Sequence, residues 1–138
     1  MADISGWIKL HRKLLDSAVF DNEKLLKIWI WCLIKASHQD IEIVVGNQLV
    51  QLQAGQFVFG RKKASVELGI SETMVYKYMK MLANMGMLDI KPNNKFSVVT
   101  IEKWDFYQGS DADVEQQTIQ QRNSRRTTKG QQRNTNRL

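Results

Sequence analysis

The side chains best suited to chemistry in this sequence gather on one face of a predicted helix in the middle of the chain. That face carries a carboxylate, a hydroxyl, a phenol and two ammonium groups, from Glu72, Thr73, Tyr76, Lys77 and Lys80. Hydroxyl, phenol and ammonium groups donate hydrogen bonds to phosphate oxygens and base edges. The pattern therefore predicts contact with nucleic acid. The alternative is a solvated face without a ligand, as in most amphipathic helices.

The helix that presents these side chains is predicted from its apolar stripe and its two ends. Val75, Met79 and Leu82 recur at three- and four-residue spacing, which is typical of a buried helix face. Ser71 is the expected N-cap, because its hydroxyl can accept a hydrogen bond from an unpaired amide of the first turn. We expect the helix to run to the residue before Gly86.

A shorter helix is predicted just before it, over residues 61–68, with Ala64 and Leu68 on its buried side. Gly69 is expected to end this helix, since glycine is common just past a helix terminus. A short helix, a glycine turn and a second helix follow one another in the order of a helix-turn-helix motif. The second helix of that motif enters the major groove of DNA.

Three cations open the shorter helix, and three further polar residues lie around a later turn. The cations oppose the helix macrodipole, and a phosphate partner would explain them as well as ordinary solvation does. The later group could reach a neighbouring DNA backbone or minor groove, although solvation is the simpler explanation for a single lysine there. These additional DNA-binding candidates are Arg61, Lys62, Lys63, Lys91, Asn94 and Lys95.

Runs of β-branched residues before the helical pair predict an inserted hairpin. Residues 41–45 and 49–52 are the expected strands, and the turn over 46–48 contains glycine beside asparagine, which suits positive φ angles. A second turn over 54–56 and a strand over 57–59 follow, and we assign them to the same inserted unit.

A second hairpin is predicted after the helical pair, with strands over 87–91 and 96–101. The turn between them contains Pro92 and Asn93, both typical turn residues. Helix, turn, helix and hairpin is the order of a winged helix-turn-helix domain. The predicted fold class is therefore α+β: a winged helix-turn-helix with an extra β-hairpin and N-terminal helices, followed by a disordered tail.

An apolar helix is predicted over about 22–37, with Asp21 or Asn22 as its N-cap. It is apolar almost all the way round, and such a helix must be buried on more than one side. In a domain of this size, we expect a second copy of the chain to bury part of it. The candidate residues for self-association are Leu25, Ile28, Trp29, Trp31 and Cys32.

The chain has 138 residues and a formal net charge of +6, which is unevenly distributed. Residues 1–109 carry 14 Lys and Arg against 11 Asp and Glu, and residues 110–138 carry 6 against 3, so each part contributes +3. A basic balance favours nucleic acid as a partner. Beyond Gln108 the sequence is polar and lacks the apolar residues needed to fold. We expect one domain over 1–109 and a disordered Gln/Asn/Arg-rich basic tail or linker over 110–138.

Other classes of function find little support. A single cysteine, Cys32, excludes an intrachain disulfide, and His11 and His38 have no further ligands at metal-binding spacing. No phosphate-binding glycine loop, nucleophile motif or pair of catalytic carboxylates occurs, so we expect no enzyme activity, no metal and no cofactor. No signal peptide or bilayer-spanning apolar run is present, so we predict a cytoplasmic protein without a membrane partner.

Five segments together resemble the N-terminal domain of phage replisome organisers of the DnaD-like class. They are residues 6–13, 26–38, 55–57, 60–62 and 93–97, and the resemblance extends over about residues 4–108. It implies a winged-helix domain that self-associates, as a dimer or higher oligomer, and binds DNA during replication initiation. Longer members add a second helical domain for helicase loading beyond a polar linker. This sequence ends at Leu138, where that domain would begin, so the resemblance covers only the DNA-binding half.

The leading hypothesis from the sequence is a winged-helix protein of a phage or mobile element that binds double-stranded DNA during replication initiation, with replication proteins of the host as further partners. Two alternatives remain open. The first is a transcriptional regulator of such an element, and the second is a protein-interaction module without specific DNA binding.

Overall fold

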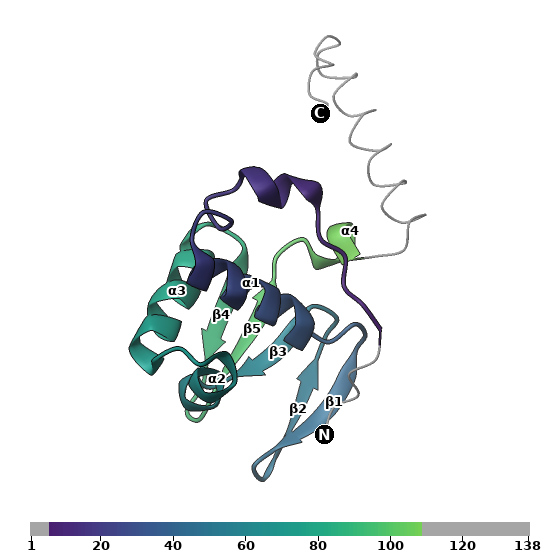
Figure 1. Ribbon diagram of the computed structural model, residues 1–138. Coiled ribbons are helices and arrows are strands. Elements are labelled where there is room, and N and C mark those ends of the chain that lie inside the picture. The colour runs from purple at the N-terminus through teal and green to yellow at the C-terminus, as the bar shows by residue number, and fades with distance from the viewer. Residues whose placement is uncertain (1–5, 109–138) are drawn as a thin grey trace. The chain divides into compact units, whose positions relative to one another are not determined.

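The computed structural model describes residues 6–108 of the chain. The chain divides into two compact units, Met1–Trp104 and Asp105–Leu138. The tail predicted over 110–138 lies outside the described residues. Within them, the protein is of the mixed α+β class, with helices and two small antiparallel sheets (Figure 1). None of the helices in residues 6–108 is long and apolar enough to cross a membrane.

Helix α1 (Glu23–Lys35) begins at the expected cap. The side-chain oxygen of Asn22 accepts hydrogen bonds from two amides of the first turn, each at 3.1 Å. The predicted helix is thus confirmed, although it is shorter at both ends than expected. A 3-10 helix, η1 (Arg12–Asp16), precedes α1, and a short helix, α4 (Trp104–Gln108), follows the last strand.

Helices α2 (Arg61–Leu68) and α3 (Glu72–Asn84) are joined by the predicted glycine turn. Gly69 has a left-handed conformation with φ of +69°, which glycine adopts without steric cost. The hydroxyl of Ser71 accepts a hydrogen bond from a first-turn amide of α3 at 3.3 Å. Both predicted caps of the helical pair are therefore confirmed.

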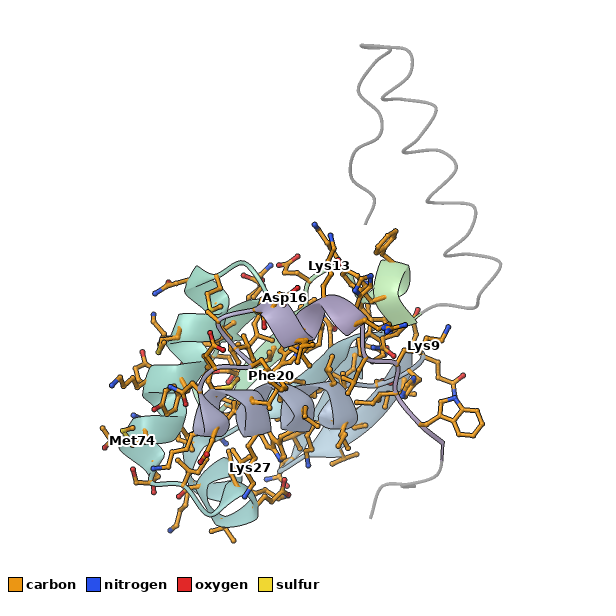
Figure 2. The ribbon with its side chains drawn as sticks, turned by 45° about the horizontal axis from the view of Figure 1, so that its top comes forward. Lys9, Lys13, Asp16, Phe20, Lys27 and Met74 are labelled. Carbon is orange, nitrogen blue, oxygen red and sulfur yellow. The ribbon has the colours of Figure 1, made fainter. Side chains whose placement is uncertain are left out.

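Two side chains from outside the turn stabilise the α2–α3 connection. The hydroxyl of Ser65 donates to the carbonyl of Ile70 at 2.6 Å. From α1, the ammonium group of Lys27 donates to the carbonyl of Leu68 at 2.7 Å (Figure 2). The last carbonyls of a helix have no partner within it, so Lys27 satisfies the carbonyl of Leu68, which would otherwise need water. The angle at which α3 leaves α2 is consequently tied to α1.

The first hairpin forms a sheet of its own. Strands β1 (Ile41–Val45) and β2 (Gln48–Leu52) pair antiparallel, with Val45 opposite Gln48. The connection is therefore the two residues Gly46 and Asn47, one fewer than the turn we predicted. Gly46 supplies the positive φ, +62°, that a two-residue hairpin loop requires.

The strand over 57–59 was predicted correctly but assigned to the wrong unit. Strand β3 (Gln56–Phe59) pairs with β5 (Ser97–Ile101), which pairs in turn with β4 (Leu88–Pro92), so the second sheet has the order β3-β5-β4. Phe57 lies opposite Val99, and both are buried. Pairing with β5 lets β3 place its aromatic side chains in the core, which an isolated hairpin could not do.

The turn between β4 and β5 has the mechanism that its residues predict. The side-chain oxygen of Asn93 accepts hydrogen bonds from the amides of Lys95 and Phe96 at 2.8 and 2.9 Å. An asparagine that binds the backbone two and three residues on mimics a backbone turn. The second predicted hairpin is therefore confirmed, although Pro92, which we assigned to the turn, is the last residue of β4 and lies opposite Ser97.

Helices α1, α2 and α3 pack with the three-stranded sheet around a single core (Figure 1). The core consists of apolar and aromatic side chains, and no buried polar or charged residue lies within the described residues. The largest fully buried side chains are those of Leu25, Ile28, Leu68, Met79, Leu82, Val19, Val75, Val99 and Cys32.

Candidate nucleic-acid interface

Helix α3 has the two faces that its spacing predicts. Val75, Tyr78, Met79 and Leu82 are buried against the core. All five of the predicted contact residues of this helix are exposed: Glu72, Thr73, Tyr76, Lys77 and Lys80. Since the helix is held by its apolar face, the exposed side chains have a defined direction and are available to a ligand.

The structure brings three of the predicted DNA-binding residues together around one aromatic ring. The guanidinium carbon of Arg61, from α2, lies 5.1 Å from the centre of the Tyr76 ring. The ammonium nitrogen of Lys80, one turn along α3, lies 5.9 Å from the same centre. Both distances fall within the range of cation–π attraction. No local pattern predicts that a residue of α2 reaches this position.

Lys77 points to another part of the α3 surface. Its ammonium nitrogen lies 5.8 Å from the centre of the Tyr78 ring, whose own side chain is buried. Lys77 therefore lies near a different ring from Arg61 and Lys80. The two lysines of α3 occupy separate positions on one exposed surface.

The remaining cations of α2 are exposed, but one of them has an acidic neighbour. The first turn of α2 contains no acidic residue, so no carboxylate within that turn offsets the positive charge of Lys62 and Lys63. Further along the helix, Glu67 attracts Lys63 electrostatically. Part of the positive charge of Lys63 is thus balanced within the protein.

Glu67 joins α1 to α2. The indole of Trp31 donates to Glu67 at 2.9 Å, and the ammonium of Lys35 lies 3.3 Å from the same carboxylate. The pKa of Glu67 is lowered from its ordinary value, chiefly by the Trp31 hydrogen bond. Partial burial opposes this shift, and the charges of Lys35 and Lys63 add smaller contributions that lower the pKa further. Sequence reasoning missed this residue. Trp31 and Lys35 are four apart and share a helix face, but nothing local identifies their partner.

The predicted residues around the β4–β5 turn are placed on a separate element. Lys91, Asn94 and Lys95 are exposed, in line with a surface role. The ammonium of Lys91 lies 3.8 Å from the carboxylate of Asp89, so its charge is partly balanced by its own strand. Lys95 is the more available cation of this hairpin.

The residues predicted for self-association are placed mainly in the chain's own core. Leu25, Ile28 and Cys32 are fully buried, because α1 packs against α3 and the sheet at once. Trp31 is half-buried, with its ring edge against Phe57 at 5.6 Å between centroids. Three of the five candidates therefore have no surface left for a second copy, and Trp29 is also half-buried against the core.

Exposed apolar side chains occur on several elements, Ile34 of α1 and Val66 of α2 among them, and two of them form a pair on the β1–β2 hairpin. Val44 and Leu49 lie directly opposite one another in the two strands and are 68% and 66% exposed. On the same face, the side chain of Gln51 donates to Glu42 at 2.9 Å. The hairpin contains no lysine or arginine, so it is chemically unlike the α2–α3 surface.

The described residues contain no group of three or more His, Cys, Asp or Glu side chains that could hold a metal ion. In comparisons with known proteins, no family model, no curated protein and no solved structure matches the chain.

Proposed function

We propose that this chain is a winged helix-turn-helix protein that binds duplex DNA through the exposed face of α3. The observation that carries the proposal is the gathering of Arg61, Tyr76 and Lys80 on that face. Exposed cations that share a small area, with a hydroxyl and a phenol among them, suit a surface of phosphates and base edges.

The winged-helix assignment is supported by the order of elements. Helix α1, strand β3, helices α2 and α3, and the β4–β5 hairpin follow one another along the chain, and β5 lies between β3 and β4. In this arrangement α3 is the second helix of the helix-turn-helix, which inserts into the major groove with its N-terminal residues leading. The β4–β5 turn, with Asn94 and Lys95, is the wing.

The contacts divide by type. Thr73 and Lys77 lie in the first half of α3, the part that would approach base edges. Arg61, Lys62 and Lys95 lie on neighbouring elements and would contact phosphates, a contribution that weakens with salt because bound counterions are released. The six Lys and Arg of residues 110–138 would add affinity without sequence preference.

The place of this binding in replication initiation rests on the resemblance of the sequence to phage replisome organisers. A protein with that role binds sites in the replication origin of its own element. We therefore expect the preferred fragment to come from the origin region, and a preference for the chain's own promoter would instead indicate a transcriptional regulator.

The test is binding of the full chain to duplex fragments of the source element's genome at several salt concentrations. Lys77→Ala should lower affinity for the preferred fragment about tenfold, the scale of one specific contact. The matched control is a variant with all six basic residues of 110–138 changed to Gln. It should lose affinity equally on every fragment and keep the preference. If the wild-type chain binds no fragment, the proposal is wrong. It is also wrong if the variant without the six basic residues loses all affinity for DNA.

A second candidate function is assembly with another protein chain. The observation that favours it comes from the β1–β2 hairpin. Val44 and Leu49 form an exposed apolar pair on an element without cations. If the chain self-associates, this pair is a better candidate surface than the buried residues of α1. Val44→Glu should then shift the sedimentation coefficient towards the monomer, whereas Leu15→Glu, at an equally exposed apolar position in η1, should not.

A further inference from the structure

The Tyr76 ring is a point where two helices and two cations meet. Arg61 reaches it from the first residue of α2, and Lys80 reaches it from the following turn of α3. Two like charges near one ring repel each other, and the electron-rich face of the ring offsets part of that cost. The ring therefore holds cations together that would otherwise spread apart.

The position of Tyr76 on α3 differs from that of the other candidates. Successive residues of a helix are about 100° apart around its axis. By this spacing Thr73 and Lys77 lie opposite the buried stripe and Lys80 lies slightly to one side of them, whereas Tyr76 lies towards a flank. Since Arg61 contacts Tyr76, the Tyr76 flank is the one next to α2.

A side chain on that flank is badly placed to read bases. A helix lying in the major groove turns the residues opposite its buried face towards the base edges, and its flanks lie nearer to the phosphates. The ring of Tyr76 is also already engaged by cations. Its useful contribution is the direction that it gives to Arg61, whose planar guanidinium stacks on aromatic rings and binds phosphate with two parallel hydrogen bonds.

We propose that Tyr76 is a positioning residue: its ring holds Arg61, with Lys80 beside it, towards a backbone phosphate of duplex DNA. This inference rests on the proposed DNA binding and specifies how one of its contacts is made. It also revises the role of Tyr76 from a reader of bases to a support for a phosphate contact. Sequence preference then depends on Thr73 and Lys77.

The proposal predicts that the ring, and not the hydroxyl, is required. In the full chain, Tyr76→Phe should bind within about twofold of the wild type, because the ring still attracts the guanidinium. Tyr76→Leu should bind about three- to tenfold more weakly on every duplex tested, with the ratio between preferred and other fragments unchanged. Arg61→Ala should do the same and lower the slope of log affinity against log salt by about one, the signature of one lost phosphate contact.

The deciding measurement is the double variant. If Tyr76 acts through Arg61, then Tyr76→Leu should cost less than about twofold in the Arg61→Ala background, because residues that act as a unit are not additive. Thr73→Ala serves as the matched control, since it alters a neighbouring residue of the same helix and should change the preference between fragments.

Any result that differs from these expectations overturns the inference, and the alternatives can be told apart. Additive losses for Arg61 and Tyr76 show that they act separately. A loss in Tyr76→Phe together with a changed fragment preference shows that the hydroxyl reads a base. In both cases DNA binding itself stands. A wild-type chain that binds no duplex removes the proposed function and this inference together, and thermal melting of each variant shows that its fold is kept.

Discussion

The ammonium group of Lys27 donates a hydrogen bond of 2.7 Å to the backbone carbonyl of Leu68, the last residue of α2. A lysine on one helix thus binds the C-terminal end of another, where a positive charge also suits the helix macrodipole. Because Leu68 directly precedes the glycine turn, this bond joins the position of α1 to the start of α3. The direction of the candidate interface depends on a residue that is not part of it.

Loss of this bond should destabilise the protein. Lys27→Met keeps most of the aliphatic stem and removes the donor, so we expect a loss of about 0.5–1.5 kcal/mol in the free energy of unfolding. Urea denaturation followed by circular dichroism measures it. Lys24→Met, at an exposed position in the first turn of α1, is the matched control and should be near neutral. Equal stability of both variants would show that the Lys27 bond contributes nothing.

The pair of Glu67 and Trp31 should make part of the stability depend on pH. The pKa of Glu67 is lowered in the folded state, chiefly by the Trp31 hydrogen bond. A carboxyl group with a lowered pKa stabilises the fold above its ordinary pKa, and this contribution disappears as the pH falls through the lowered value. Glu67→Gln should therefore be less stable than the wild type at pH 7, by under about 1 kcal/mol because the pair is partly exposed. The difference should shrink below about pH 4.

The measurement is urea denaturation of both proteins between pH 7 and pH 3. Lys35→Met is a useful companion, since it removes the charge partner and keeps the Trp31 bond. A difference between wild type and Glu67→Gln that stays constant with pH would contradict the linkage.

Cys32 should be unreactive while the protein is folded. Its side chain is completely buried, and burial raises the pKa of the thiol well above its ordinary value, so almost no thiolate is present at neutral pH. We expect the rate of alkylation by iodoacetamide at pH 8 to fall at least a hundredfold below the rate in urea, since opening to about the global stability is required. Mass spectrometry of timed samples gives both rates. Rapid labelling without denaturant would show that α1 leaves the core easily.

Among the glycines that the structure describes, Gly55 should be the least tolerant of substitution. Its φ is +88°, and a Cβ atom there would lie 2.7 Å from Trp104, closer than packed atoms can approach. Gly55→Ala should therefore cost more than about 2 kcal/mol, from backbone strain and steric overlap together. Gly46→Ala is the control, because it shares a positive φ but has nothing within 4 Å. Thermal melting of the two variants should rank Gly55→Ala well below Gly46→Ala, and a reversed order would be inconsistent with close packing of Trp104.

Local signals predicted the ends of α1, α2 and α3 closely. Gly69, Ser71 and Asn22 mark helix ends in the sequence and do so in the structure, because capping involves groups only a few residues apart. The buried stripe of α3 also follows from spacing alone, since helix periodicity places its members on one side. The turn at Asn93 is predictable for the same reason.

Assignments that depend on distant partners were less successful. Strand β3 was recognised as a strand, but its place in the second sheet follows from pairing with β5, far along the chain. The apolar surface of α1 suggested a second copy as its cover, whereas the chain's own α3 and sheet bury Leu25, Ile28 and Cys32. A hydrophobic pattern shows that a face must be covered and does not identify what covers it.

The sequence by itself determined where the helices of the interface begin and end and which residues of α3 face outward, because caps and periodicity act within a few residues. Only the tertiary structure decided that Arg61 meets Tyr76, that Glu67 joins Trp31, and that Lys27 binds the end of α2. These contacts depend on how whole helices pack, and packing is set by the combined burial of many distant side chains.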